Sequence, residues 1–478
     1  MQVGITGFGA YIPIFRMDKK LVGDMWEKWG GKGQKAVANW DEDSLTMAIE
    51  ACLDSLRAEH SEPIEGVVFS STTPPYYEKQ SASFIRKVLD LSPNVFATDI
   101  CNSLRGGTIG MRIAMDAVKS GLSGNYIVAS SDLRLAPPNS ALELQIGDGA
   151  AALMIGSKDP LAVINDHYSV SSEFIDSWRR DKDTYIQMWE DRFVMSAGYQ
   201  PMMVESIKTF MSTLKVTASD YAFAVIGAPT LREMKTVAKK TGFTFGSQVS
   251  PLLFEEVGNT GTALSFMLLV EALEKAKPGD RILLASYGDG IDLFDITVTD
   301  NIASFPKGRG IQSHLDSKMT LPSYGSYLRF RNLLKWEFDR RLPDRTSLPV
   351  INRESSQIYS LHGSKCRNCG AIQYPIQRIC PECQSKDDFE EINISRSKGN
   401  IFTFSMDERA MVPDLPNVLC IADLAEGGRY YSVMTDRIPA SIKIGMQVEM
   451  TFRRIHEGLQ LYNYFWKTRP VRANTSEG

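Results

Sequence analysis

A constant spacing between two similar segments is the feature that most limits how this chain can fold. Residues 105–131 align with residues 260–286 without a gap, and the pattern of each segment predicts a helix, a turn and a strand. The identical pairs, each 155 positions apart, are Gly106/Gly261, Ala117/Ala272, Gly124/Gly279, Ile127/Ile282 and Ser131/Ser286. This spacing predicts two related α/β halves packed about a pseudo-twofold axis. The alternative is two unrelated units that share ordinary turn chemistry.

Composition excludes several classes of protein. The 478 residues contain 53 Lys and Arg against 57 Asp and Glu, which gives a net charge of −4 and no basic excess for binding nucleic acid. Hydrophobic residues make up 43% and charged residues 23%, as in ordinary globular domains. The sequence contains neither an apolar run long enough to span a membrane nor a secretory leader. We therefore expect a cytoplasmic protein without a membrane or nucleic-acid partner.

The hydrophobic pattern changes character near residue 300. Before that point, short apolar strands alternate with amphipathic helices, including a helix near 42–58, a strand at 66–71 and a helix at 106–120. Afterwards the pattern is irregular and then strand-rich, which indicates a separate small β domain. The predicted division is 1–165 and 166–302 for the two halves, 303–350 for a linker with a helical segment, 351–395 for a zinc ribbon and 396–478 for a β-barrel.

Four of the seven cysteines form one cluster. Cys366, Cys369, Cys380 and Cys383 make two C-x-x-C pairs separated by ten residues. Two such pairs can give one Zn²⁺ four thiolate ligands in a tetrahedron. Four thiolates leave no position open for water, so we expect the zinc to be structural and not catalytic. Cys52 and Cys420 lie in apolar contexts and are predicted core residues.

Cys101 lies where a nucleophile would be expected. It follows the predicted strand NVFATDI and precedes Gly106 and Gly107, which begin a helix. The helix dipole and free N–H groups at such a position would lower the pKa of a thiol and stabilise a thioester oxyanion. At the repeat spacing Leu104 corresponds to Asn259, so the two loops are expected to meet near the axis. The alternative is that Cys101 is a buried small apolar residue.

Residues 1 to about 300 resemble the thiolase superfamily, and within it the archaeal and bacterial hydroxymethylglutaryl-CoA (HMG-CoA) synthases. The resemblance implies a duplicated, five-layered α/β/α/β/α fold, a homodimer, and acyl transfer from a coenzyme A thioester through an acyl-cysteine enzyme. The segments that carry it are ITGFGAYIP (5–13), SSDLR with QIGDGAAALMIG (130–156), SEFIDSWRRDKDTY (172–185), DYAFAVIGAP (220–229), and GNTGTAL with AKPGDRILLASYGDG (258–290).

Carried over position by position, the resemblance is incomplete. Cys101 matches the nucleophile, and Asn259 in GNTG matches the Asn that helps to hold the acyl-CoA thioester. The synthase Glu falls on Thr72 and the synthase His on Gly227, so both general acid/base groups are missing. Glu78 lies a few residues on and is expected to be a solvated side chain. The predicted substrate-binding positions are Thr72, Gly227, Gly258 and Gly288. Gly227 would leave space for an acyl group larger than acetoacetyl.

The C-terminal part resembles acyl-CoA-associated proteins that join a zinc ribbon to an OB-fold β-barrel. Proteins of this kind usually accompany thiolase-like enzymes, which implies a possible thiolase partner. The aromatic residues Tyr462, Tyr464, Phe465 and Trp466 are expected mainly to fill the barrel core. Packing against the condensing domain or a partner is the alternative.

Three functions remain open from the sequence. The leading hypothesis is an acyl-CoA-dependent enzyme that makes or breaks a carbon–carbon bond through an acyl-Cys101 thioester, with a substrate other than standard acetoacetyl-CoA. The second is a scaffold that binds acyl-CoA and a thiolase subunit without chemistry of its own. The third is a C-acyltransferase acting on an activated aromatic acceptor, which needs less help from a base.

Overall fold

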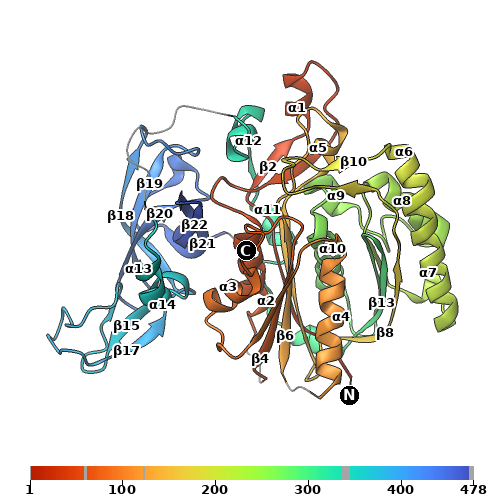
Figure 1. Ribbon diagram of the computed structural model, residues 1–478. Coiled ribbons are helices and arrows are strands. Elements are labelled where there is room, and N and C mark those ends of the chain that lie inside the picture. Colours follow the sequence, from red (N-terminus) through yellow and green to blue (C-terminus); the bar gives the residue numbers. More distant parts are fainter. Residues whose placement is uncertain (1, 59–61, 122–123, 335–344, 473–478) are drawn as a thin grey trace.

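The fold is known from a computed structural model that describes residues 2–58, 62–121, 124–334 and 345–472 (Figure 1). Nine strands form one sheet in the order β11-β12-β13-β8-β1-β7-β6-β4-β5. The strands of the first half are β1 (Gly4–Tyr11), β4 (Ile64–Ser70), β5 (Phe96–Ile100), β6 (Asn125–Asp132) and β7 (Gly149–Gly156). Those of the second half are β8 (Ala162–Ser171), β11 (Phe223–Ile226), β12 (Arg281–Tyr287) and β13 (Gly290–Val298).

The strand order confirms the predicted duplication. In the first half β1 and β7 are antiparallel, as are β7 and β6, whereas β6 and β4 are parallel. The second half repeats this pattern with β8, β13, β12 and β11. The two halves join where the first strand of each, β1 and β8, pair with each other. Among the described residues of the sheet, β5 alone has no counterpart in the second half.

The helices complete five layers, as expected (Figure 1). One outer layer contains α2 (Ser44–Ser55) and α3 (Ser81–Val88), and the other contains α7 (Gln200–Leu214) and α8 (Leu231–Thr241). The central helices are α4 (Gly106–Lys119) and α10 (Leu264–Lys275). Every residue of α10 from Leu264 to Leu273 is buried, because this helix packs against strands of both halves. No helix of the described ranges is long and apolar enough to cross a membrane.

Shorter elements surround these layers. Strands β2 (Phe15–Asp18), β3 (Gln34–Val37) and β14 (Met319–Thr320) form a small sheet, and β9 (Ser177–Trp178) pairs with β10 (Gln187–Met188). The short helices are α1 (Lys20–Met25), α5 (Ala141–Gln145), α6 (Asp191–Phe193), α9 (Leu252–Glu256), α11 (Gln312–Asp316) and α12 (Tyr324–Phe330). A π-helix (Val194–Tyr199) precedes α7. Part of the segment predicted as a linker, residues 335–344, lies outside the described residues.

The C-terminal part contains the zinc ribbon and a closed barrel. Helices α13 (Leu348–Arg353) and α14 (Ser355–Tyr359) lead into the ribbon strands β15 (His362–Cys366), β16 (Ile372–Gln373) and β17 (Phe389–Asn393). The barrel strands are β18 (Lys398–Asp407), β19 (Asn417–Leu424), β20 (Arg429–Met434), β21 (Gln447–Gly458) and β22 (Leu461–Pro470). They close in the order β18-β19-β20-β22-β21, so the predicted five-stranded OB-type barrel is present.

The barrel packs against the outer helical layer that contains α2 and α3 (Figure 1). The hydroxyl of Tyr464 donates a hydrogen bond to Asp43 Oδ2 at 2.7 Å, and its ring lies 5.3 Å from that of Phe84. Tyr462 also contacts the condensing domain, through the ring of Tyr76. Trp466 is fully buried in the same apolar cluster as Tyr464 and Phe84, and its Nε1–H donates to the carbonyl of Tyr359 at the end of α14. The expectation that these aromatic residues mainly fill the barrel is therefore wrong for Tyr462 and Tyr464.

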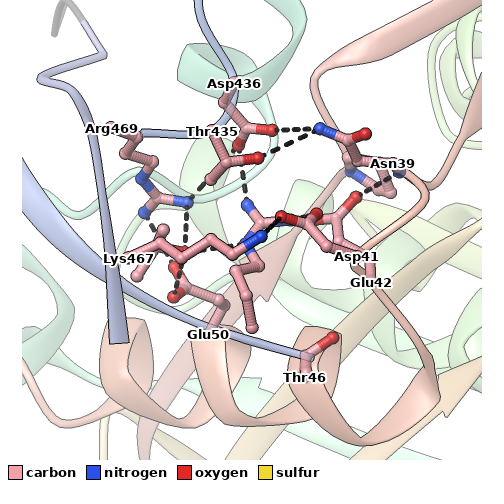
Figure 2. Close-up of polar contacts among 12 residues, drawn as sticks. Asn39, Asp41, Glu42, Thr46, Glu50, Thr435, Asp436, Lys467 and Arg469 are labelled. Carbon is pink, nitrogen blue, oxygen red and sulfur yellow. Dashed lines mark hydrogen bonds and ion pairs between the residues drawn. The ribbon is translucent and has the colours of Figure 1, made fainter. Parts of the chain in front are cut away.

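Buried ion pairs connect the barrel to α2 (Figure 2). Lys467 pairs with Asp41 at 2.8 Å, and Arg469 pairs with Glu50 at 2.7 Å. Arg453 contacts Asp41 and Glu42 of the condensing domain as well as the barrel residue Asp436. Arg472 and Asn39 also hydrogen-bond to Asp436, and Arg309 pairs with the barrel residue Glu449. We call these charged residues the interdomain network: Asp41, Glu42, Glu50, Arg309, Asp436, Glu449, Arg453, Lys467, Arg469 and Arg472.

Complementary charge makes the interdomain network possible. The condensing domain contributes mainly carboxylates and the barrel mainly cations, so the five acidic and five basic groups of the network balance. Burial alone would raise the pKa of Asp436, but Arg453, Arg472 and Arg469 hold it well below its ordinary value. The folded state therefore favours ionised Asp436, which stabilises the protein above the pKa of an unfolded Asp. That contribution is lost as the pH falls through the lowered, folded-state value.

The substitution Asp436→Asn should weaken the docked barrel. It leaves several buried guanidinium groups short of a counter-ion, a change that typically costs about 3–5 kcal/mol in the free energy of unfolding. Denaturant unfolding at pH 7 measures this cost, and the difference from wild type should shrink in strongly acidic buffer. Asp423→Asn is the matched control, because its pair with Arg429 is exposed and should matter little. Equal effects of the two substitutions would contradict the structural role of the network.

Candidate active site and zinc ribbon

Cys101 lies directly after the end of β5, at the start of a loop that leads into α4. Its side chain is half-buried. The loop is tied to the second half of the fold, because Ser103 Oγ donates to the carbonyl of Gly288 at 3.2 Å. Arg105 also reaches across and pairs with Asp292 at 2.9 Å. The position between a strand end and the central helix is thus the one predicted from the sequence.

The expected lowering of the thiol pKa is wrong. Burial raises the pKa of Cys101 to about 11, and the nearby carboxylates of Asp99 and Asp132 add to the shift. The helix also begins only at Gly106, whose N–H is occupied by the carbonyl of Ser103. Partial removal from water is thus the larger cause of the raised pKa, and the two carboxylates add to it. The thiol is neutral at physiological pH until a substrate or a base changes its surroundings.

Asp132, at the end of β6, organises the loops around Cys101. Its Oδ1 accepts hydrogen bonds from Ser71 Oγ at 3.0 Å, from the backbone N–H of Thr72 at 2.7 Å and from Thr73 Oγ1 at 3.1 Å. Its Oδ2 accepts from the backbone N–H of Thr262 at 2.8 Å. This buried carboxylate thus joins the loop after β4 to the loop before α10. Asp132 lies in the segment SSDLR, which carries the family resemblance, but no motif in the sequence marks it as a site residue.

A small pocket opens beside these loops. Residues from both halves line it, including Leu104 and Asn259, which the repeat spacing paired. Most of its wall is apolar, and the residues that provide this wall include Leu142, Ile146, Ile186, Met188, Val194, Met195 and Leu264. The pocket therefore suits a group that is largely hydrocarbon, placed where the two pseudo-symmetric loops meet.

Asn259 and Gly227 lie together on the pocket wall. Asn259 Nδ2 donates to the carbonyls of Ala228 and Pro229 at 3.2 and 3.1 Å, and its Oδ1 accepts from the N–H of Gly261. Its amide is rigidly held, and both of its donor hydrogens are used. A Cβ atom on Gly227 would lie 2.7 Å from Ser265 Oγ. The space next to Gly227 is therefore partly filled by that hydroxyl, and the predicted room for a larger acyl group remains a prediction.

The other positions singled out from the sequence are structural in this arrangement. Thr72 binds Asp132 through its N–H and accepts from Arg179 through its carbonyl at 2.6 Å. Gly258 and Gly288 have φ of 95° and 158°, and a Cβ atom on either would meet backbone atoms at 2.8 Å. None of these three lines the pocket. Glu78 is exposed, as expected.

Three pocket residues were not found from the sequence. The hydroxyl of Tyr287, at the end of β12, donates to Asp176 Oδ2 at 2.7 Å. Burial and the Asp176 carboxylate raise the pKa of Tyr287 well above its ordinary value, so Tyr287 stays protonated. Arg134 lines the same pocket. Asp176 and Arg134 occur in the quoted segments FIDSWRRD and SSDLR, which provided the signal that could have identified them.

The four clustered cysteines form a site for a tetrahedral metal. Their sulfur atoms all lie within 4.8 Å of one another, with Cys366 and Cys383 at 3.6 Å and Cys369 and Cys380 at 3.5 Å. Four thiolates about 2.3 Å from one zinc ion would lie just under 4 Å apart, so the donor set fits Zn²⁺. Gly370 follows the first pair with φ of 77°, as its tight turn requires. The ribbon thus provides a structural zinc site far along the chain from Cys101.

Comparisons with known proteins agree with both parts of this description. Residues 211–298 match the family model "3-Oxoacyl-[acyl-carrier-protein (ACP)] synthase III C terminal". Residues 357–390 match "ChsH2, rubredoxin-like zinc ribbon domain". A solved structure of an HMG-CoA synthase complexed with CoA covers 73% of this chain and 94% of its own, with a TM-score of 0.64 at 17% identity. A 3-oxoacyl-(acyl carrier protein) synthase III from Pseudomonas aeruginosa gives a TM-score of 0.57 at 17% identity, covering 63% of this chain and 99% of its own.

Curated relatives identify the family. The hydroxymethylglutaryl-CoA synthase of Aeropyrum pernix is 33% identical over 346 residues, which cover 70% of this chain and 95% of the relative. That of Methanosphaera stadtmanae is 31% identical over 345 residues, which cover 70% of this chain and 99% of the relative. The chain belongs to the hydroxymethylglutaryl-CoA synthase family of the thiolase superfamily, and carries a ChsH2-type zinc ribbon and a closed β-barrel after its condensing domain.

Proposed function

We propose that the chain is an acyl-CoA-dependent condensing or acyl-transfer enzyme in which Cys101 carries the acyl group. The observation that carries this proposal is the pocket at which Leu104, three residues after Cys101 in the chain, meets Asn259 of the second half; Cys101 itself is not among the residues of the pocket wall. The family membership supports acyl-CoA condensation as the class of reaction. The loss of Glu and His at Thr72 and Gly227 supports a substrate other than acetoacetyl-CoA. We also propose the domain division that the sequence predicts, in which residues 351–478 form an accessory region.

The first chemical step is an exchange of thioesters. The Cys101 thiol loses its proton, its sulfur attacks the carbonyl carbon of the acyl-CoA, and the carbon–sulfur bond to coenzyme A breaks. Coenzyme A leaves as a thiolate and takes up a proton, so no oxidant or reductant is needed. The raised pKa of Cys101 makes the first proton transfer the demanding part of this step.

We propose a second groove as the entry for coenzyme A. It shares Gln145, Asp191 and Met195 with the pocket, so the two adjoin. Its wall includes three cations, Lys19, Lys32 and Arg232, which suit the phosphates of the coenzyme. Three glutamates and Asp191 also line it, so the groove has four carboxylates against three cations and is not a positive surface. We propose that the phosphates bind here while the acyl chain enters the pocket.

A partner-dependent scaffold is the second candidate function. The raised pKa of Cys101 and the missing acid/base residues favour it. In that case the chain would bind acyl-CoA and a thiolase subunit and would not itself be acylated.

A homodimer is the assembly that we propose. Strand β5 is the edge of the nine-stranded sheet, next to Cys101, and its Phe96 side chain is 49% exposed. An edge strand offers unpaired N–H and C=O groups to a second copy.

Light scattering after gel filtration should give about twice the chain mass of 53.3 kDa. Phe96→Asp should shift the protein toward the monomer, whereas a wild-type mass of one chain would contradict the proposal.

Intact-protein mass spectrometry after incubation with acyl-CoA tests the proposed function directly. A panel from acetyl-CoA to aromatic acyl-CoA should give an adduct equal to the acyl mass, and its strength should rank the substrates. Cys101→Ala should give no adduct, while Cys52→Ala, which removes a fully buried thiol, should retain it. Absence of any adduct on folded, zinc-loaded wild-type protein would favour the scaffold.

The reactivity of Cys101 should rise steeply with pH. Because its pKa is raised to about 11, the thiolate fraction should increase about tenfold for each pH unit between pH 7 and 9. The rate constant for alkylation by iodoacetamide, located by peptide mapping, measures this dependence. A plateau near neutral pH would show that the thiol is activated in the free protein and would contradict the assignment.

A further inference from the structure

A groove lies between the condensing domain and the C-terminal region, where α14 packs beside α3 (Figure 1). It shares no residue with the pocket near Cys101. Its volume of about 780 Å³ is that of a small-molecule site, and such sites often form between domains. One wall is α3 with the loop before it, and the other combines α13, α14 and the start of β22. We call it the interdomain groove.

The α3 wall of the interdomain groove is positively charged. Its cations are Lys79, Arg86 and Lys87, against the one carboxylate of Asp90. That carboxylate is already engaged by the zinc ribbon, because His362 Nε2 lies 2.6 Å from Asp90 Oδ2. The groove is thus a local positive site in a chain whose net charge is −4. This charge balance favours an anion as its ligand.

The three cations are held at the groove and keep N–H donors for a ligand. The Lys79 ammonium lies over the ring of Phe84, 5.0 Å from its centroid, and donates no hydrogen bond to any residue that the structure describes. Lys87 donates to Ser356 Oγ at 3.1 Å, and Arg86 donates to the carbonyl of residue 91 at 3.2 Å. An ammonium has three donors and a guanidinium five, so these single bonds fix the side chains without exhausting them.

The opposite wall is apolar and uncovered. No residue of α13 is buried, and Leu348 at its start is 62% exposed. Ile351 of the same helix and Leu461 of β22 continue this wall. The aromatic rings of the groove pack against one another, so the apolar surface left for a ligand is mainly aliphatic. A saturated hydrocarbon chain matches this wall better than a flat ring does.

We propose that the interdomain groove binds the anion of an aliphatic monocarboxylic acid. Its carboxylate accepts hydrogen bonds from the cations of α3, and its chain covers Leu348, Ile351 and Leu461. A phosphate is disfavoured, because Asp90 and Asp99 lie near the lysines and oppose a second negative charge. The ligand contacts both domains and therefore stabilises their docking. This site requires no acylation of Cys101, so it goes beyond the proposed function.

The first test isolates the contribution of the charged headgroup. Calorimetry compares decanoate, below its micellar concentration, with the neutral decan-1-ol. We expect decanoate to bind about 10- to 100-fold more tightly, the range for hydrogen bonds to charged groups. The double substitution Lys79→Met and Arg86→Met should abolish this preference. The matched control is Lys208→Met with Lys239→Met, two exposed lysines of α7 and α8, and it should keep the preference.

A pair of substitutions in α13 tests the apolar wall. Leu348→Ser changes a side chain that lines the groove, whereas Val350→Ser changes one that is exposed on the same helix but does not line it. Leu348→Ser should weaken decanoate and decan-1-ol alike, by about fivefold, because each loses apolar contact. Val350→Ser should leave both affinities unchanged. Equal effects of the two substitutions would contradict the proposed position of the chain.

Chemical protection locates the headgroup independently. Decanoate should slow the acetylation of Lys79 by acetic anhydride, measured by peptide mapping, and leave that of Lys239 unchanged. Cys101→Ala protein should bind decanoate as the wild type does, whether or not Cys101 is ever acylated. A loss of binding in Cys101→Ala would place the anion in the pocket instead and overturn the proposal. No binding to the wild type, or equal binding after Lys79→Met and Arg86→Met, would also refute it.

Discussion

The interdomain network is the constraint on which the rest of the molecule depends. Buried charges tolerate little displacement, because separating a carboxylate from its guanidinium in the interior costs far more free energy than separating an exposed pair does. Arg453 and Arg469 each bind acidic groups from both domains, so the barrel has one position relative to α2. A purely hydrophobic surface would permit sliding. The ion pairs therefore convert an accessory barrel into a fixed part of the outer layer.

The fixed outer layer also determines what the central layers can do. Helix α2 packs on β1 and β7. Farther along the same sheet, β6 ends at Asp132, and Cys101 follows the end of the edge strand β5. Asp132 joins loops from both pseudo-symmetric halves, and both halves contribute residues to the pocket, so the pocket depends on the packing of the two halves against each other. Rigidity thus extends from the barrel through α2 and the sheet to the loops beside Cys101.

The sequence predicted those features that depend on local pattern or on a repeat. The spacing of 155 residues placed Leu104 near Asn259, and the four cysteines defined the ribbon. The sequence did not predict features that depend on ion pairs between residues far apart in the chain. Asp41 and Lys467 are separated by most of the chain, and no local signal pairs them. The expected lowering of the Cys101 pKa was wrong mainly because burial of the side chain raises that pKa, and local sequence does not reveal the burial. The carboxylates of Asp99 and Asp132 add to the shift.

The proposed loss of the family's acid/base residues at Thr72 and Gly227 would have a coherent physical consequence. Thr72 now holds its loop through backbone bonds to Asp132 and Arg179, and Gly227 lies against the hydroxyl of Ser265. Neither position can move a proton. Exchange of thioesters needs only a thiolate and a polarised carbonyl, whereas forming a carbon–carbon bond also requires a carbanion at the acceptor. A site of this composition is therefore better suited to transferring an acyl group than to deprotonating an acceptor. The acceptor must then be acidic itself, or the pair of Tyr287 and Asp176 must assist it.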